Sequence, residues 1–323
     1  MKWIACELHT HTVHSDGQFT LSTLTQRAAE IGLDAVALTD HNAVSAIGEA
    51  ETGDYPCGII NGLEWTTYYG HVLVLGASRY VDWRDVTPEN IDEKLRAVKA
   101  AGGLTGMAHP YAAGGPVCCG CFWEFRLQDW ALLDYLEIWS GGTPQLTGYN
   151  RRARELWNRL LDRGFRTTAV SARDWHGGED DSKPYGVTYL LVDENETLTD
   201  AAKDALKKHR AFVSVGPELT EFSARRALHT AQMGESMTPG KVSVTLRFQV
   251  GRRFHAWKNF HIKPEKIVLL HSGGVLAEMP YEEDVMLTVN AVEPEKWMRA
   301  EVWGTMNGSR CELLVSNPIF IEG

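Results

Sequence analysis

The sequence lacks several features that would each place it in a different class of protein. No apolar run approaches the roughly 20 residues that a membrane-spanning helix requires. Positive charge is in deficit, with 32 Lys and Arg against 42 Asp and Glu and a net charge of -10. Binding a phosphate backbone needs a basic face, so nucleic acid is not expected as the main partner. We also find no internal repeat and no low-complexity tract.

Cysteine is scarce, and its placement excludes a dense disulfide framework of the kind found in small secreted domains. The six cysteines in 323 residues are Cys6, Cys57, Cys118, Cys119, Cys121 and Cys311. The first residues run straight into an expected strand, without the apolar segment and cleavage site of a signal peptide. We therefore expect a cytoplasmic protein that does not associate with membranes.

In the first two thirds of the chain, strands and helices alternate. Helices are expected where apolar side chains recur at helical spacing, at residues 21–31, 88–101, 151–163 and 199–209. Short apolar runs predict buried strands at residues 3–8, 35–38, 58–63, 72–75, 104–107, 135–138 and 166–171. This alternation predicts a parallel sheet with helical crossovers, and about seven strands suit a barrel.

After Pro217 the pattern changes to strands separated by turn-rich segments. The expected strands lie at residues 241–250, 266–271, 285–291, 300–304 and 312–315. We predict an α/β barrel domain over residues 1–217 and an all-β, sandwich-like domain over residues 218–323. Covering the barrel and mediating homodimer formation are both open as roles for the second domain.

Residues that can bind metal fall mostly at the ends of the expected strands. They are His9, His11, Asp16, His41, Glu64, His71, His109, Asp174 and His176. Active sites of β/α barrels form at the carboxyl ends of several strands. His71 is the exception, since it begins its strand. A single His-x-His pair or a lone buried Glu would more often be structural, but nine such residues at equivalent positions predict a metal centre.

The types of these residues indicate which metals they would bind. Imidazole and carboxylate together suit Zn, Mn or Fe better than Ca or Mg. Nine ligands exceed what one ion can use, so we expect two or three divalent ions. A bridging carboxylate such as Glu64 would allow two ions roughly 3.5–4 Å apart with a hydroxide between them. Asp40, beside His41, is expected to orient an imidazole instead of binding metal itself.

Successive motifs of the chain resemble those of the PHP (polymerase and histidinol phosphatase) family. They are H-T-H-T-V-H-S-D-G at residues 9–17, L-T-D-H-N at 38–42, G-L-E at 62–64, A-H-P at 108–110 and R-D-W-H-G at 173–177. The segment E-W-T-T-Y-Y-G-H-V-L-V-L-G at 64–76, the cysteine-containing loop after His109 and the C-terminal N-P-I-F-I resemble the CehA/McbA-like metallohydrolase subgroup more closely.

The resemblance implies a distorted seven-stranded, TIM-like β/α barrel that holds two or three metal ions. It implies three ligand sets: His9, His11, Glu64 and Asp174; Glu64, His71 and His109; and Asp16, His41 and His176. Hydroxide between the first two ions would be the nucleophile, so Glu64 and Asp174 would flank the reaction.

The sequence departs from the family pattern at two positions, Arg173 and Ser140, where Ser and Asn are common. Arg173 is interpreted as a catalytic residue that either clamps an anionic group or pairs with a neighbouring carboxylate.

Further candidate substrate contacts are Tyr68, Tyr69, Arg151 and Lys183, although each could be an ordinary loop residue. The cluster of Cys118, Cys119 and Cys121 could shape the pocket or contribute to another Zn site, which would need four ligands.

These observations favour a metal-dependent hydrolase that acts on a small-molecule phosphate ester, that is, a phosphoesterase. Hydrolysis of a carbamate, ester or amide is the alternative, because a tetrahedral and a pentavalent centre need similar metal clamps. A non-catalytic metal-binding module is a third possibility. The loss of several metal ligands would favour it, and none of the nine is lost.

Overall fold

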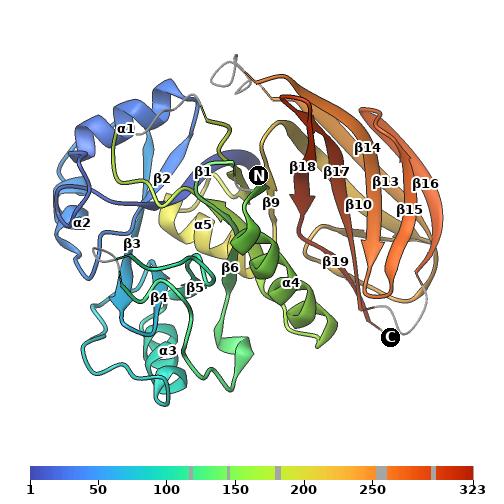
Figure 1. The fold of residues 1–323 in the computed structure, drawn as a ribbon. Helices are drawn as coiled ribbons and strands as arrows, with labels where there is room; N and C mark the ends of the chain where they lie inside the picture. Colours follow the sequence, from blue (N-terminus) through green and yellow to red (C-terminus); the bar gives the residue numbers. More distant parts are fainter. Residues whose placement is uncertain (116–118, 144–145, 179–182, 252–259, 292–295, 323) are drawn as a thin grey trace.

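Seven strands of the N-terminal part lie side by side in chain order (Figure 1). They are β1 (Lys2–Thr10), β2 (Ala35–Leu38), β3 (Gly58–Thr67), β4 (Gly70–Leu75), β5 (Leu104–Met107), β6 (Tyr135–Ser140) and β7 (Thr168–Ala172). This computed structural model describes residues 1–115, 119–143, 146–178, 183–251, 260–291 and 296–322. Strands covered on both faces need apolar side chains throughout, which is why these segments appear as continuous apolar runs in the sequence.

The expectation of a wholly parallel sheet is wrong at β4, which runs antiparallel to both β3 and β5. Only Tyr68 and Tyr69 separate β3 from β4, and a two-residue connection can join only antiparallel strands. As a result, the start of β4 lies beside the end of β3, where His71 pairs with Thr66. His71 therefore occupies the same edge of the sheet as the residues that end the other strands.

The segment after β7 returns to the end of β1. His11 N donates to Trp175 O at 2.9 Å, and Trp175 N donates to His9 O at 3.0 Å. This contact brings residues 173–176 against the histidines of β1. Closure of the seven strands into a TIM-like barrel stays a prediction.

The helices α1 (Leu21–Glu30), α2 (Ser45–Ala50), α3 (Ile91–Ala100) and α4 (Gly148–Asp162) lie between these strands, and α5 (Leu198–Lys207) follows them. All but α2 were predicted; α2 is six residues long and buries only Ala46, so it carries no helical periodicity. Thr20 caps α1 by accepting a hydrogen bond from the Thr23 N–H. Among the described residues, no helix has the length and apolarity to cross a membrane.

The strands after β9 form an all-β region, drawn from gold through orange to red in Figure 1. After β8 (Val187–Val192) and β9 (Ala211–Ser214), it contains β10 (Pro217–Arg226), β11 (His229–Gln232), β12 (Ser236–Met237), β13 (Gly240–Val250), β14 (Ile262–His271), β15 (Gly274–Pro280), β16 (Asp284–Ala291), β17 (Trp297–Met306), β18 (Ser309–Ser316) and β19 (Ile319–Ile321). Strands β11, β10, β13 and β16 make a separate four-stranded sheet. Apolar side chains of both sheets pack into one core.

The larger sheet continues from the α/β part into the all-β region, because β9 pairs with β18. The Asn317 side chain also bridges the two parts, accepting from Ala169 N at 2.8 Å and donating to Ala169 O at 3.0 Å. The mixed α/β fold and the extra all-β region are thus observed, and residue 217 as a domain boundary stays a prediction.

Candidate metal centre

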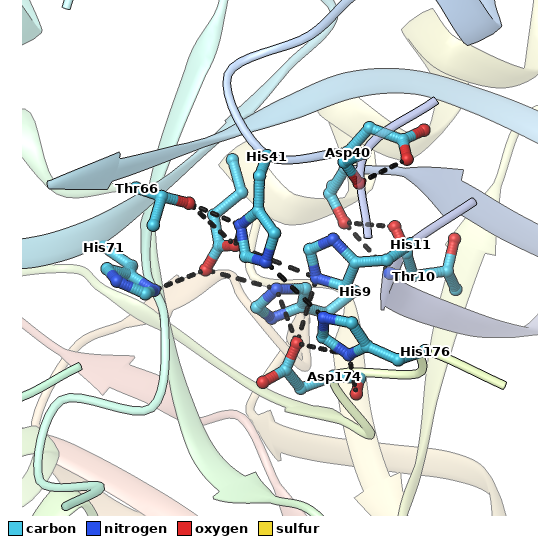
Figure 2. A network of polar contacts seen from close by, with 12 residues as sticks. His9, Thr10, His11, Asp40, His41, Thr66, His71, Asp174 and His176 are labelled. Atoms are coloured by element: carbon cyan, nitrogen blue, oxygen red, sulfur yellow. Dashed lines mark hydrogen bonds and ion pairs between the residues drawn. The ribbon is translucent and has the colours of Figure 1, made fainter. Parts of the chain in front are cut away.

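The structure brings the nine predicted metal-binding side chains together at one edge of the sheet. Figure 2 labels six of them: His9, His11, His41, His71, Asp174 and His176. Their ligand atoms form three overlapping groups, which are His9, His11 and Asp174; His9, Glu64 and His109; and His11, Asp16, His41 and His176. His71 joins the second group through Glu64. Their function as ligands stays a prediction, since this arrangement shows only that they lie close enough to share ions.

Glu64 lies at the centre of the cluster, fully buried at the end of β3. Three imidazole nitrogens surround its Oε1 atom: His71 Nδ1 at 3.1 Å, His9 Nε2 at 3.3 Å and His109 Nε2 at 3.4 Å. Two more face Oε2, His41 Nδ1 at 2.7 Å and His11 Nε2 at 3.7 Å. A carboxylate whose two oxygens face different sets of ligands has the arrangement that a bridging metal ligand requires.

Asp174 closes the cluster on the side of β7. Its Oδ1 atom lies 2.9 Å from His11 Nε2 and 3.3 Å from His9 Nε2. Asp174 and His109 both adopt positive backbone angles, with φ of 55° and 25°. Residues other than glycine rarely adopt this conformation, and when they do they cluster at functional sites.

The third group combines Asp16 with two imidazoles. Asp16 Oδ1 lies 3.2 Å from His176 Nε2 and 3.4 Å from His41 Nε2, and the two Nε2 atoms are 3.4 Å apart. His176 Nδ1 donates to the backbone oxygen of Asp174, and His41 Nδ1 faces Glu64. In the neutral rings both Nε2 lone pairs therefore point toward the Asp16 carboxylate, an arrangement that a shared cation would stabilise.

His9 provides the clearest test of whether these residues fit metal ions. Its Nδ1 donates to Glu137 Oε1 at 2.8 Å, which leaves the lone pair of the neutral ring on Nε2. That Nε2 atom is buried, has no hydrogen bond, and faces the oxygens of Glu64 and Asp174. A buried lone pair facing two carboxylates fits a divalent cation.

The electrostatics of the cluster lead to the same conclusion. Burial by itself would lower the pKa of His9 and His109. The carboxylates around them outweigh burial, so the pKa of His9 rises well above its usual value and that of His109 to about 9. Burial would raise the pKa of Glu64, but the charge of His9 and hydrogen bonds from other imidazoles lower it well below its usual range. The cluster thus attracts positive charge, and a metal ion would displace protons from it.

Two buried carboxylates that support the cluster were not predicted from the sequence. Glu137 of β6 holds His9 and also accepts from His109 N at 2.7 Å. Glu7 of β1 accepts from His9 N at 3.1 Å and Arg173 N at 2.9 Å. Burial raises the pKa of Glu7 to about 7, although the nearby Arg173 charge lowers it. For both Glu137 and Glu7, the sequence signal that could have revealed this function is an acidic residue within an otherwise apolar strand.

The expectation that Asp40 orients an imidazole is wrong. Its carboxylate accepts from Thr12 N at 2.8 Å and from Ser15 Oγ at 2.7 Å, and its observed hydrogen bonds include no imidazole among the described residues. Asp40 instead orders the loop that leads to Asp16. A short polar side chain after a strand gives no sequence signal to distinguish these two roles.

Arg173 is an interior residue with 5% of its surface exposed. Its guanidinium lies between two aromatic rings, 3.9 Å from the centroid of Trp175 and 3.7 Å from that of Tyr185. Together with its effect on Glu7, this placement favours pairing with a neighbouring carboxylate over clamping an anion. A catalytic function for Arg173 stays a prediction.

The predicted substrate contacts differ in their placement. Tyr68 and Tyr69 line a cavity beside the metal centre, whereas Arg151 and Lys183 are exposed to solvent.

In the cysteine-containing loop, Cys119 is exposed, Cys121 is buried, and Cys118 lies outside the described residues. The groups of described side chains that could hold a metal include no cysteine, and the question of another Zn site stays open.

Comparison with known proteins relates this geometry to a family. Residues 7–105 match the PHP domain. Two curated relatives, each named 5'-3' exoribonuclease Rnm, come from Escherichia coli and Salmonella typhimurium. Each is 28% identical over 141 residues, which cover 38% of this chain and 48% of the relative. The matched region thus spans about half the length of these relatives.

A solved structure extends the likeness to the whole fold. It is a two-domain protein from Bacteroides vulgatus that contains a predicted PHP-like metal-dependent phosphoesterase. The TM-score is 0.53 at 16% sequence identity, with 98% of this chain and 95% of the other covered. At this identity the likeness concerns the fold alone, and the closer resemblance to the CehA/McbA-like subgroup stays a prediction. The chain thus contains a region that matches the PHP domain, and groups of its His, Asp and Glu side chains lie close enough together to hold metal ions.

Proposed function

We propose that this protein is a phosphoesterase that hydrolyses a small-molecule phosphate ester with two or three divalent ions of Mn, Zn or Fe. The observation that carries this proposal is the placement of Glu64, whose two carboxylate oxygens face five imidazoles that lie in or directly after four strands, β1, β2, β4 and β5. Bound ions would supply Lewis acidity toward the phosphoryl oxygen and a water of lowered pKa.

The residues of the chain prepare this chemistry in three ways. Glu137 keeps the proton of His9 on Nδ1, so that Nε2 faces the cluster. Thr66 donates to Glu64 Oε2 at 3.3 Å and restricts the orientation of that carboxylate. Burial of Glu64, His9 and His71 excludes water from this side of the site, which strengthens its electrostatic interactions.

Two other substrate classes compete with a small phosphate ester. Carbamates, carboxyl esters and amides would use the same ligands. RNA is a further possibility because both curated relatives are named exoribonucleases. The net charge of -10 favours a small substrate over an RNA backbone. A non-catalytic module is disfavoured, because all nine predicted side chains are present and lie in overlapping groups or in contact with them.

A substrate screen on metal-loaded protein tests the proposal. We expect the highest kcat/KM on phosphate monoesters, compared with matched carbamates, carboxyl esters and a 5'-phosphorylated RNA oligonucleotide. Removal of the ions by a chelator should abolish turnover, and Mn, Zn or Fe should restore it. Preferred turnover of a carbamate or of RNA, or turnover that survives chelation, would contradict the proposal.

A further inference from the structure

A cavity of about 510 Å³ opens beside the metal centre, a size typical of sites for small molecules. Its walls come from the β3–β4 turn, from residues 83–87 and from Cys119. The lining residues that matter for its chemistry are Thr66, Tyr68, Tyr69, Trp83, Val86 and Cys119.

Two of the residues that line the cavity also contact residues of the metal centre. Thr66 lines it and donates to Glu64 Oε2 at 3.3 Å. Cys119 lines it too, and its backbone oxygen lies 3.3 Å from His71 Nε2. A molecule in the cavity would therefore contact Thr66 and Cys119, the residues that join the cavity to Glu64 and His71.

Three of the residues that line the cavity have aromatic side chains, which can contact a ligand. Tyr68 is 76% exposed at the tip of the β3–β4 turn, so its ring is available to a ligand. Trp83 and Tyr69 are half-buried and pack against the core, which holds their rings in place. Flat side chains fixed in this way offer stacking surfaces to another ring.

The two charged residues in the wall, Arg84 and Asp85, each form an ion pair with a neighbouring side chain. Arg84 Nη2 lies 2.7 Å from Asp82 Oδ2, and Arg84 Nε donates to Asp82 Oδ1 at 2.9 Å. Asp85 Oδ1 lies 2.6 Å from Lys94 Nζ. With both charges paired, the cavity suits an uncharged ring better than an anionic or cationic group.

We propose that this cavity binds an uncharged, planar aromatic ring of the substrate while the ester group reaches the metal centre. The inference rests on the proposed function and makes the substrate an aromatic phosphate ester. Hydrolysis would break the bond between phosphorus and the ester oxygen and join phosphorus to the oxygen of water. The proton from water would pass to the leaving oxygen, giving inorganic phosphate and an aromatic alcohol or a nucleoside. The ring could belong to a simple aryl group or to a nucleobase.

Kinetics with three phosphate monoesters test the inference. Phenyl phosphate and adenosine 5'-monophosphate carry the two kinds of ring, and ethyl phosphate carries none. In Trp83→Ala, the kcat/KM of the preferred aromatic ester relative to ethyl phosphate should fall about tenfold, the scale of one lost stacking contact. Tyr80→Ala is the matched control, because it removes an aromatic ring that lines a separate recess, and it should leave this ratio unchanged.

Equilibrium binding separates this inference from the proposed function. Phenol and adenosine, titrated by saturation-transfer NMR, should bind the wild-type protein and lose affinity in Trp83→Ala and in the exposed-turn variant Tyr68→Ala. Such binding without hydrolysis of any phosphate ester would refute the phosphoesterase and keep the aromatic site. Unchanged binding and an unchanged kinetic ratio in both variants, with folding verified by circular dichroism, would overturn the inference.

Discussion

Glu64→Gln is expected to lower kcat/KM on the preferred phosphate ester at least about a thousandfold, or about 4 kcal/mol, with the protein still folded. Glutamine keeps the shape of the side chain and removes its negative charge. The five imidazoles around Glu64 would lose the anion that they share. Steady-state kinetics of metal-loaded protein measure the effect.

Glu49→Gln provides the matched control for this charge removal. Glu49 pairs with His14 Nε2 at 2.9 Å on the surface, outside the metal centre. We expect wild-type kinetics from this variant and an unaltered circular dichroism spectrum from both. A kcat near that of the wild type in Glu64→Gln would show that the reaction does not depend on this cluster.

The second large effect concerns stability. Glu301 of β17 is 2% exposed and contacts two arginines, the partly buried Arg154 of α4 and the buried Arg299 of β17. Burial raises the pKa of Glu301, but these arginines outweigh it and the pKa is lowered. Glu301→Gln would remove the carboxylate that pairs with the buried Arg299 and leave Arg154 with Glu312 alone, so the free energy of unfolding should fall by about 3–5 kcal/mol. Urea denaturation followed by circular dichroism measures this change.

A surface ion pair of the same all-β region gives the control. Glu278 Oε2 lies 2.8 Å from Lys266 Nζ and is half exposed. Glu278→Gln should cost less than about 1 kcal/mol, because solvent screens the pair. Equal losses in the two variants would mean that the buried cluster does not stabilise the contact between α4 and β17.

The seven N-terminal strands and most of the clustered side chains, though not His71, could be predicted from the sequence for one physical reason. Buried strands appear as apolar runs, and polar residues directly after them must lie at the edge of the sheet. Strand direction has no such signal, so the antiparallel course of β4 and the reason for the position of His71 appear only in the structure.

The supporting residues were harder to predict because they act through contacts distant in sequence. Glu137 meets His9 across 128 positions, and Glu7 meets the backbone of Arg173 across 166. Neither pairing changes the local apolar pattern of its strand. The same holds for Asn317, whose side chain fixes the all-β region to β7.

The metal content of the purified protein tests the central claim most directly. Elemental analysis after expression in medium supplemented with Mn, Zn and Fe should find two or three ions per chain, since the cluster contains three groups of ligands. One ion or fewer per chain would contradict the account of this site as a multinuclear hydrolase centre.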